Sequence, residues 1–152
     1  MGHVIDHATP RDLDALVAIL EACFSSPWTP EMMAEELERP MAQVLVVRPA
    51  KGMPPIAFVD CWLVADEMHV LNLATHPAHH RQGRARRLME AVLTLAHQRR
   101  VQCVTLELRQ SNRAASRLYG ALGFVPIGTR PKYYADTGED AVVMVCRLAA
   151  QG

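Results

Sequence analysis

The chain has 152 residues, of which 50% are apolar and 21% are charged, and its 16 Lys and Arg residues balance 16 Asp and Glu residues. This length fits a single domain over residues 1–152 with a substantial core. The neutral balance excludes a general nucleic-acid binder, which would carry a clear excess of positive charge.

The N-terminal segment and the cysteines indicate the compartment. MGHVIDHATPRDLD lacks the apolar core of a signal peptide, and no apolar run approaches the roughly 18 residues that span a bilayer. The cysteines lie far apart among apolar neighbours without Cys-x-x-Cys spacing, so we expect buried free thiols in a reducing compartment. They are Cys23, Cys61, Cys103 and Cys146. The sequence predicts a cytoplasmic protein without a membrane partner.

The first half of the chain predicts two helices and three strands. Thr9 and Thr29 are each followed by proline, the signature of an N-cap with proline at the first helical position. They predict helices that end near Phe24 and before Pro40. The three glutamates of MMAEELE are expected on a solvated face of the second helix. QVLVVR, PIAFVDCWLVA and EMHVLNLAT are separated by short turns and predict an antiparallel meander.

The second half alternates between helix and strand. Ala85, Leu88, Met89, Val92 and Ala96 recur at helical spacing. VQCVTLELR then predicts a strand, NRAASRLYGALG a helix, FVPIGT a strand and YYADTGEDAVVMVCRL a turn with a last strand. A meander followed by this alternation predicts one α/β domain, with a mixed sheet and crossover helices on its faces.

The basic loop THPAHHRQGRARRL lies between a predicted strand and a predicted helix. This geometry presents free backbone N–H groups and the positive end of a helix dipole to an anion. Gly83 lets the backbone approach closely, and Ala85 is nearly as small. Arg81, Arg84 and Arg86 add charge where a pyrophosphate would lie. From the loop alone, it is equally possible that these basic residues are solvated at the start of a helix and bind no anion.

Three histidines of this loop raise the question of a metal. His76, His79 and His80 fall within five residues. No cysteine or carboxylate lies at ligand spacing nearby, and Pro77 with Ala78 indicates a turn. We therefore predict solvated histidines and no metal site.

Two longer segments carry a family resemblance. LNLATHPAHHRQGRARRLMEAVL and LELRQSNRAASRLYGALGF resemble the Gcn5-related N-acetyltransferase (GNAT) superfamily. Its acetyl-coenzyme A motif, Gln/Arg-x-x-Gly-x-Gly/Ala, falls on residues 80–85, with His80 in place of the first Gln or Arg. The resemblance implies a mixed, mostly antiparallel sheet with splayed central parallel strands and flanking helices.

The resemblance also implies how acetyl-coenzyme A (acetyl-CoA) is bound. The pyrophosphate would lie on the loop, and the backbone of the preceding strand would hold the acetyl carbonyl and the pantetheine arm. An asparagine would hydrogen-bond the cofactor. The residues so assigned are Leu73, Ala74, Thr75, Arg81, Gln82, Gly83, Arg84, Ala85, Arg86 and Asn112.

Acetyl transfer to an amine needs a base for the amine and a proton donor for the departing thiolate. Glu107 alternates with apolar residues in VTLELR, and a carboxylate on an inner strand needs a cleft, water or a partner. From spacing alone, Glu107 could equally well be a glutamate near the solvent-exposed end of its strand. Tyr119 and Asn112 lie two helical turns apart and share a face, although a tyrosine there can simply pack. The resemblance implies that Glu107 is the base and Tyr119 the acid.

PW, LELRQSN, RLYGALGF and KYYADTGEDAVVM together resemble the RimI branch of the superfamily, which acetylates the N-terminus of a ribosomal protein. The resemblance implies that the substrate is a protein N-terminus, and the N-terminal alanine of a ribosomal protein is the leading candidate. It also implies that Trp28 and Tyr134 form walls of a peptide groove. Two alternatives stay open. One is an acetyltransferase for a small amine or amino acid, and the other is a non-catalytic module that binds acyl-CoA.

Overall fold

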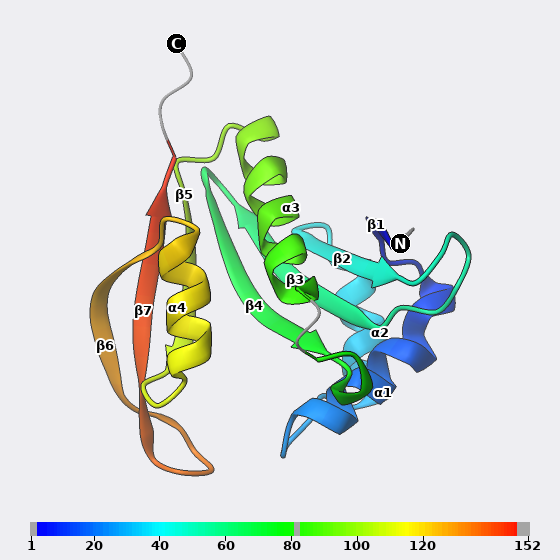
Figure 1. Ribbon diagram of the computed structural model, residues 1–152, viewed down its shortest axis with the longest axis horizontal. Helices are drawn as coiled ribbons and strands as arrows, with labels where there is room; N and C mark the ends of the chain where they lie inside the picture. The colour runs from blue at the N-terminus through cyan, green and yellow to red at the C-terminus, as the bar shows by residue number, and fades with distance from the viewer. Residues whose placement is uncertain (1–2, 81–82, 149–152) are drawn as a thin grey trace.

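The computed structural model describes residues 3–80 and 83–148. One seven-stranded sheet, in the order β1-β2-β3-β4-β5-β7-β6, has helices packed on both faces (Figure 1). The strands are β1 (Val4–His7), β2 (Ala42–Arg48), β3 (Ala57–Val64), β4 (Glu67–Thr75), β5 (Cys103–Arg109), β6 (Val125–Tyr134) and β7 (Glu139–Arg147). The helices are η1 (Pro10–Asp12), α1 (Leu13–Cys23), α2 (Pro30–Glu38), η2 (Pro77–His79), α3 (Arg84–Gln98) and α4 (Arg113–Ala121).

The predicted meander is confirmed, because β2, β3 and β4 pair antiparallel in sequence order. The helix starts follow the threonine caps: Thr29 Oγ1 accepts from Met32 N at 3.1 Å, while Thr9 opens a short 3₁₀ turn before α1. Strand β1 was not predicted, because four residues are too few for a periodic pattern. It forms one edge of the sheet, and β6, exposed along nearly its whole length, forms the other.

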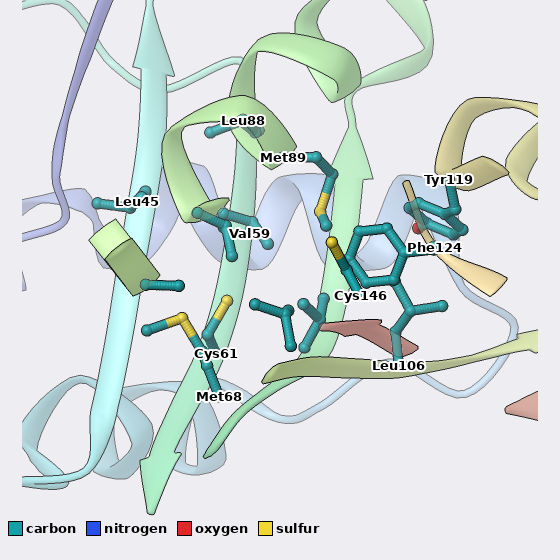
Figure 2. Packing of buried hydrophobic residues seen from close by; sticks show 14 of the residues in the cluster. Leu45, Val59, Cys61, Met68, Leu88, Met89, Leu106, Tyr119, Phe124 and Cys146 are labelled. Atoms are coloured by element: carbon teal, nitrogen blue, oxygen red, sulfur yellow. The ribbon is translucent and has the colours of Figure 1, made fainter. Parts of the chain in front are cut away.

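The core consists of two clusters, one on each face of the sheet. On the α3 face, Leu88 and Met89 pack over the central strands, and Phe124 lies beside Tyr119 (Figure 2). On the other face, α1 and α2 cover only the β2–β4 half of the sheet, where Leu16 and Met33 are fully buried. Among the described residues, no helix therefore covers the β5–β7–β6 half of that face (Figure 1).

This partial cover explains the alternation of VTLELR in β5. A strand covered by helices on both faces would be apolar throughout. Burial along Cys103–Arg109 instead alternates strictly, with Val104, Leu106 and Leu108 buried and the residues between them partly exposed. The polar side of β5, which carries Glu107, lies on the α1–α2 face of the sheet, in the part that these helices do not cover.

A bulge in β4 opens the centre of the sheet. Asp60 pairs with Asn72 and Cys61 pairs with Val70, so Leu71 is the extra residue. An extra residue bends the strand that contains it. The parallel β4–β5 pairing ends at the same point, with Val70 opposite Leu106. Beyond the bulge, no strand of residues 3–80 and 83–148 pairs with the edge of β4 that faces β5, which is the expected splay of the two parallel strands.

All four cysteines are free. Cys61 and Cys146 are buried as expected, whereas Cys23 and Cys103 are partly exposed, so the prediction of four buried thiols is wrong for two of them. Cys23 Sγ donates to the backbone oxygen of Thr75 at 3.2 Å, which brings the end of α1 to the end of β4. Among the described residues, no helix is long and apolar enough to cross a membrane.

A buried pair of acids lies between α2 and β3 and corrects the expectation that all three glutamates of MMAEELE lie in solvent. Glu36, one of the three glutamates expected in solvent, is 2% exposed. It accepts from Trp62 Nε1 at 2.7 Å and from Arg39 Nε at 3.1 Å. Asp60 is fully buried beside it, and desolvation followed by the Glu36 carboxylate raises the pKa of Asp60 to about 9. Asp60 is therefore protonated at neutral pH, and neither of its carboxyl oxygens has a hydrogen-bond partner among the described residues.

This pair makes folding stability depend on pH. The pKa of Asp60 rises from 3.8 to about 9 on folding, so between these values the folded chain keeps a proton that the unfolded chain has lost. Stability must then fall as pH rises, by ~1.4 kcal/mol per pH unit at most. Asp60→Asn keeps the size of the side chain but cannot titrate, so we expect the free energy of urea unfolding of this variant to vary less between pH 5 and 8. Asp66→Asn, in the exposed β3–β4 turn, is the control, and equal slopes for wild type and Asp60→Asn would contradict the assignment.

Candidate active site

A cavity of approximately 490 Å³ lies between the end of β4, the start of α3 and the first turn of α4. Its lining includes every described residue that was predicted to bind the cofactor: Leu73, Ala74, Thr75, Gly83, Arg84, Ala85, Arg86 and Asn112. The remaining two, Arg81 and Gln82, lie outside the described residues. Segments more than thirty residues apart are thus brought together around one space, as the motif predicts.

The start of α3 offers an anion site built from the backbone. Gly83 is the N-cap of α3 in the left-handed region, at φ 75°, where residues with a side chain are strained. A Cβ at this position would meet nothing within 4 Å, so the surface over Gly83 is open. The first N–H groups of α3 have no acceptor within the helix and carry the positive end of its dipole.

Arg84 contributes charge from beneath this surface. Its side chain is 7% exposed, and its Nη2 lies 2.6 Å from Nε2 of His3. Desolvation, followed by the charge of Arg84, lowers the pKa of His3, so its ring is neutral and accepts from the guanidinium. The Nε and Nη1 atoms of Arg84 are buried without a hydrogen-bond partner among the described residues. The positive charge is therefore held beside the cavity.

The loop histidines have local structural contacts. His76 Nδ1 accepts from the backbone N–H of Ala78 at 3.2 Å and caps the short η2 turn. His80 Nε2 lies 2.8 Å from the backbone oxygen of Thr75, which ties the loop to the end of β4. His80, which stands at the first motif position, therefore takes part in the fold of the loop itself.

A second cavity of approximately 910 Å³ opens on the other side of the β4–β5 gap. It is lined by the α1–α2 loop, the facing parts of β4 and β5, and the β6–β7 loop, and it includes Trp28, Glu107, Tyr119 and Tyr134. Leu73, Asn112, Ala115 and Tyr119 line both cavities. The two spaces therefore meet at the splay, with Tyr119 where they join.

Glu107 lies in this groove with two charged or polar neighbours. Its side chain is 10% exposed; its Oε2 is 3.0 Å from Nε2 of His69, and its Oε1 is 3.3 Å from Nε of Arg130. The sequence reasoning missed both neighbours. His69 is opposite Thr105 in the parallel β4–β5 register, two residues before Glu107 and on the same face of β5, and this parallel pairing was the signal that could have identified it. Arg130 lies on a part of β6 beyond the predicted strand.

Tyr119 is buried in the last turn of α4. Desolvation, followed by Tyr134, raises the pKa of Tyr119 to about 12. Its ring packs against Phe124 with 5.8 Å between the centroids. Asn112 is the N-cap of α4, and its Oδ1 accepts from Ala115 N at 3.1 Å, which leaves its amide N–H₂ to donate to a ligand. Packing and a proton-donor role are compatible for Tyr119, because its phenol stays protonated over the physiological range.

The tyrosine wall of the groove is held by an arginine that the sequence reasoning did not single out. Arg109 donates to both carboxylate oxygens of Asp136, at 3.0 and 2.9 Å, and its Cζ lies 4.2 Å from the centroid of the Tyr134 ring. Ser25 Oγ lies 3.4 Å from Asp136 Oδ2, which connects the α1–α2 loop to the β6–β7 loop. Trp28 is partly buried against the α1–α2 core and faces the same groove.

Comparison with known proteins gives the family. Residues 13–124 match the family model "Acetyltransferase (GNAT) family". The chain is 34% identical over 135 residues to a putative ribosomal protein bS18-alanine N-acetyltransferase of Bacillus subtilis, covering 88% of each chain. It is 33% identical over 149 residues to the ribosomal protein bS18-alanine N-acetyltransferase of Escherichia coli, covering 97% of this chain and 99% of the relative.

Solved structures agree with this assignment. The crystal structure of the ribosomal-protein-S18-alanine N-acetyltransferase from Escherichia coli superposes with a TM-score of 0.89 at 30% identity, over 99% of this chain and 96% of that chain. NAA60 of Arabidopsis thaliana, at 18% identity and a TM-score of 0.86, shares the fold. The chain therefore belongs to the acetyltransferase (GNAT) family and is an N-acetyltransferase.

Proposed function

We propose that the protein transfers the acetyl group of acetyl-CoA to the α-amine of a protein N-terminus, with the N-terminal alanine of ribosomal protein bS18 as its substrate. The observation that carries the proposal is the meeting of two cavities at the β4–β5 splay. One contains the anion-binding start of α3, and the other contains Glu107 and Tyr119. An acetyl donor and an amine entering from opposite sides would meet between these two side chains.

The residues present fit acetyl-CoA. Free N–H groups at the start of α3 suit the pyrophosphate, and the Arg84 charge beneath them strengthens the attraction. Because the Arg84 nitrogens are buried, direct contact with phosphate falls to the backbone and to Arg86, which is exposed on the cavity wall. The unpaired edge of β4 from Leu73 to Thr75 offers backbone groups to the pantetheine arm, which carries amides of its own. Bound acetyl-CoA would supply the activated acyl group.

The two assigned side chains then divide the proton transfers. Glu107 accepts a proton from the substrate ammonium, directly or through a water molecule, so that the neutral amine can attack the acetyl carbon. Tyr119 donates a proton to the sulfur of coenzyme A as the thiolate leaves, and the second proton that the attacking nitrogen loses restores the phenol. The groove carries no helix over Glu107, so a chain end can enter between Trp28 and Tyr134.

The choice of substrate rests on the relatives and on the groove. Relatives at 33–34% identity are named for the alanine of bS18. A pocket for a polyamine would offer unpaired acids, yet Asp136 is paired with Arg109, and Glu139 Oε2 accepts from the backbone N–H of Ser111 at 2.5 Å. The joint presence of Glu107 and Tyr119 at the splay favours a catalyst over a non-catalytic acyl-CoA-binding module.

The loop assignment predicts the effect of Gly83→Val. A side chain over the open surface at Gly83 would keep phosphate from the backbone N–H groups, so the affinity for acetyl-CoA should fall by about 10–100-fold, the worth of one charge-assisted hydrogen bond. Gly52, in the β2–β3 turn at φ 81°, is equally strained by a side chain and equally open. Gly52→Val therefore controls for backbone strain. Calorimetry that finds equal affinities for the two variants would rule out the loop as the phosphate site.

The substrate assignment is tested with peptides. The protein is incubated with acetyl-CoA and a peptide carrying the bS18 N-terminus, and mass spectrometry locates the acetyl group. We expect acetylation of the α-amine and none of internal lysines, and a peptide with a blocked N-terminus should stay unmodified. Faster acetylation of free alanine or a polyamine than of the peptide would overturn the proposal in favour of a small-amine enzyme.

A further inference from the structure

Glu107 is part of a hydrogen-bonded row that crosses the splayed strands on the face without a helix. His69 of β4 stands next to Glu107, with 3.0 Å between His69 Nε2 and Glu107 Oε2. The other ring nitrogen, Nδ1, lies 2.7 Å from Oγ1 of Thr105. Both ring nitrogens are therefore engaged, one by the base and one by a hydroxyl. The His69 side chain is 34% exposed, whereas that of Glu107 is 10% exposed.

We propose that His69 is a positioning residue for acetyl transfer, which faces the Glu107 carboxylate and takes from it the proton that the substrate ammonium gives up. This rests on the proposed role of Glu107 as base. A base that is largely enclosed must return to its carboxylate form before each turnover. The neighbouring imidazole, which is more exposed, gives the proton a route to solvent that does not pass through the occupied substrate groove.

The proton transfers balance atom by atom. An N–H bond of the substrate ammonium breaks and an O–H bond forms on Glu107. In the neutral ring of His69 the hydrogen is on Nδ1, so Nε2 keeps a free lone pair. The O–H bond of Glu107 breaks and an N–H bond forms at Nε2, which gives an imidazolium and restores the carboxylate. The imidazolium then loses the Nε2 proton to water. Thr105 Oγ1 accepts from Nδ1–H in both states of the ring, because a hydroxyl oxygen has acceptor lone pairs.

The surroundings of the ring support this route over a fixed ion pair. Glu107 and Thr105 face it from β5, and Trp62 stands opposite it in the β3–β4 register. The indole N–H of Trp62 is already donated to Glu36, so it does not compete for the ring. Nε of Arg130 in β6 lies 3.3 Å from Oε1 of Glu107, whereas His69 Nε2 lies 3.0 Å from Oε2. One oxygen of the base is thus stabilised by a fixed charge, and the other faces a group able to exchange a proton.

The test compares His69→Gln with Arg130→Gln under steady-state conditions. Glutamine keeps a hydrogen-bond donor for Glu107 but cannot carry a proton away, so His69→Gln should lower kcat by roughly 10–10²-fold with little change in KM for either substrate. The acidic limb of its pH–rate profile should also lose one ionisation. Arg130→Gln removes a charge beside the same carboxylate without removing a proton acceptor, so its profile should keep both ionisations. Thermal unfolding checks that both variants fold.

Chemical rescue gives a second measurement. Added imidazole should restore turnover of His69→Ala and leave Arg130→Gln unchanged. Wild-type kcat and an unchanged profile in His69→Gln, or a loss in His69→Ala that imidazole does not relieve, would overturn the inference. Those results would leave Glu107 as base intact, whereas an active Glu107→Gln would remove the base assignment itself, so the two failures can be told apart.

Discussion

Turnover of Glu107→Gln is expected to fall by roughly 10²–10⁴-fold, the usual contribution of a positioned general base. Glutamine matches the shape of the carboxylate and can still meet His69 and Arg130, so the fold and the groove should be preserved. The affinity for acetyl-CoA should be almost unchanged, because Glu107 lines the substrate groove and is absent from the lining of the cofactor cavity.

The pH dependence of this loss identifies its cause. An unperturbed α-amine has a pKa of about 8, so a growing fraction of the substrate is already neutral as pH rises above that value. The deficit of Glu107→Gln should therefore shrink at high pH. The measurement is kcat/KM across the pH range on a peptide beginning with alanine. A deficit that stays constant with pH would mean that Glu107 contributes through structure or charge rather than as a base.

The second large effect is expected for Tyr119→Phe, which should also slow turnover by roughly 10²–10⁴-fold. The change removes only the hydroxyl, and the ring can keep its packing against Phe124. Burial raises the pKa of Tyr119 to about 12, so the wild-type phenol remains a proton donor well into the alkaline range. Because the missing function is a donor, raising the pH should not restore the variant.

The two variants therefore differ in their response to pH, and each serves as the control for the other. Calorimetry should find acetyl-CoA bound by both, and thermal unfolding should show both folded. If Tyr119→Phe retained near-wild-type turnover, Tyr119 would be a packing residue and the thiolate would be protonated by water. Near-full activity in both variants would mean that the chemistry has been assigned to the wrong side chains.

Most of the fold could be predicted because local signals agreed with the tertiary structure. Thr29 with its proline marks the start of α2, and the pattern EMHVLNLAT matches the bounds of β4. What sequence could not give was which helix covers which strand. The polar side of β5 is open because α1 and α2 stop at β4, and nothing in VTLELR indicates where a distant helix ends.

The site was predictable where a motif has a fixed spacing along the chain. The loop around Gly83 is such a case, because strand, loop and helix follow one another directly. Contacts made across strands were not. His69 reaches Glu107 only because of the β4–β5 register, and Arg109 reaches Asp136 only after β6 and β7 turn back. Glu36 was misplaced for the same reason, since its buried partner Asp60 lies on another element.

The two borders of the sheet have a consequence for self-association. A strand at the border of a sheet can template the addition of another chain, which leads to aggregation. At one border, β1 is only four residues long. At the other, β6 contains Pro126 and Pro131, which lack a backbone N–H, and its pairing with β7 is irregular near both prolines. Arg130 and Lys132 add charge of one sign to the same strand. Neither border therefore presents a long, regular row of backbone N–H donors. The chain can thus keep an open groove beside its catalytic strand without a second molecule adding a strand to the sheet.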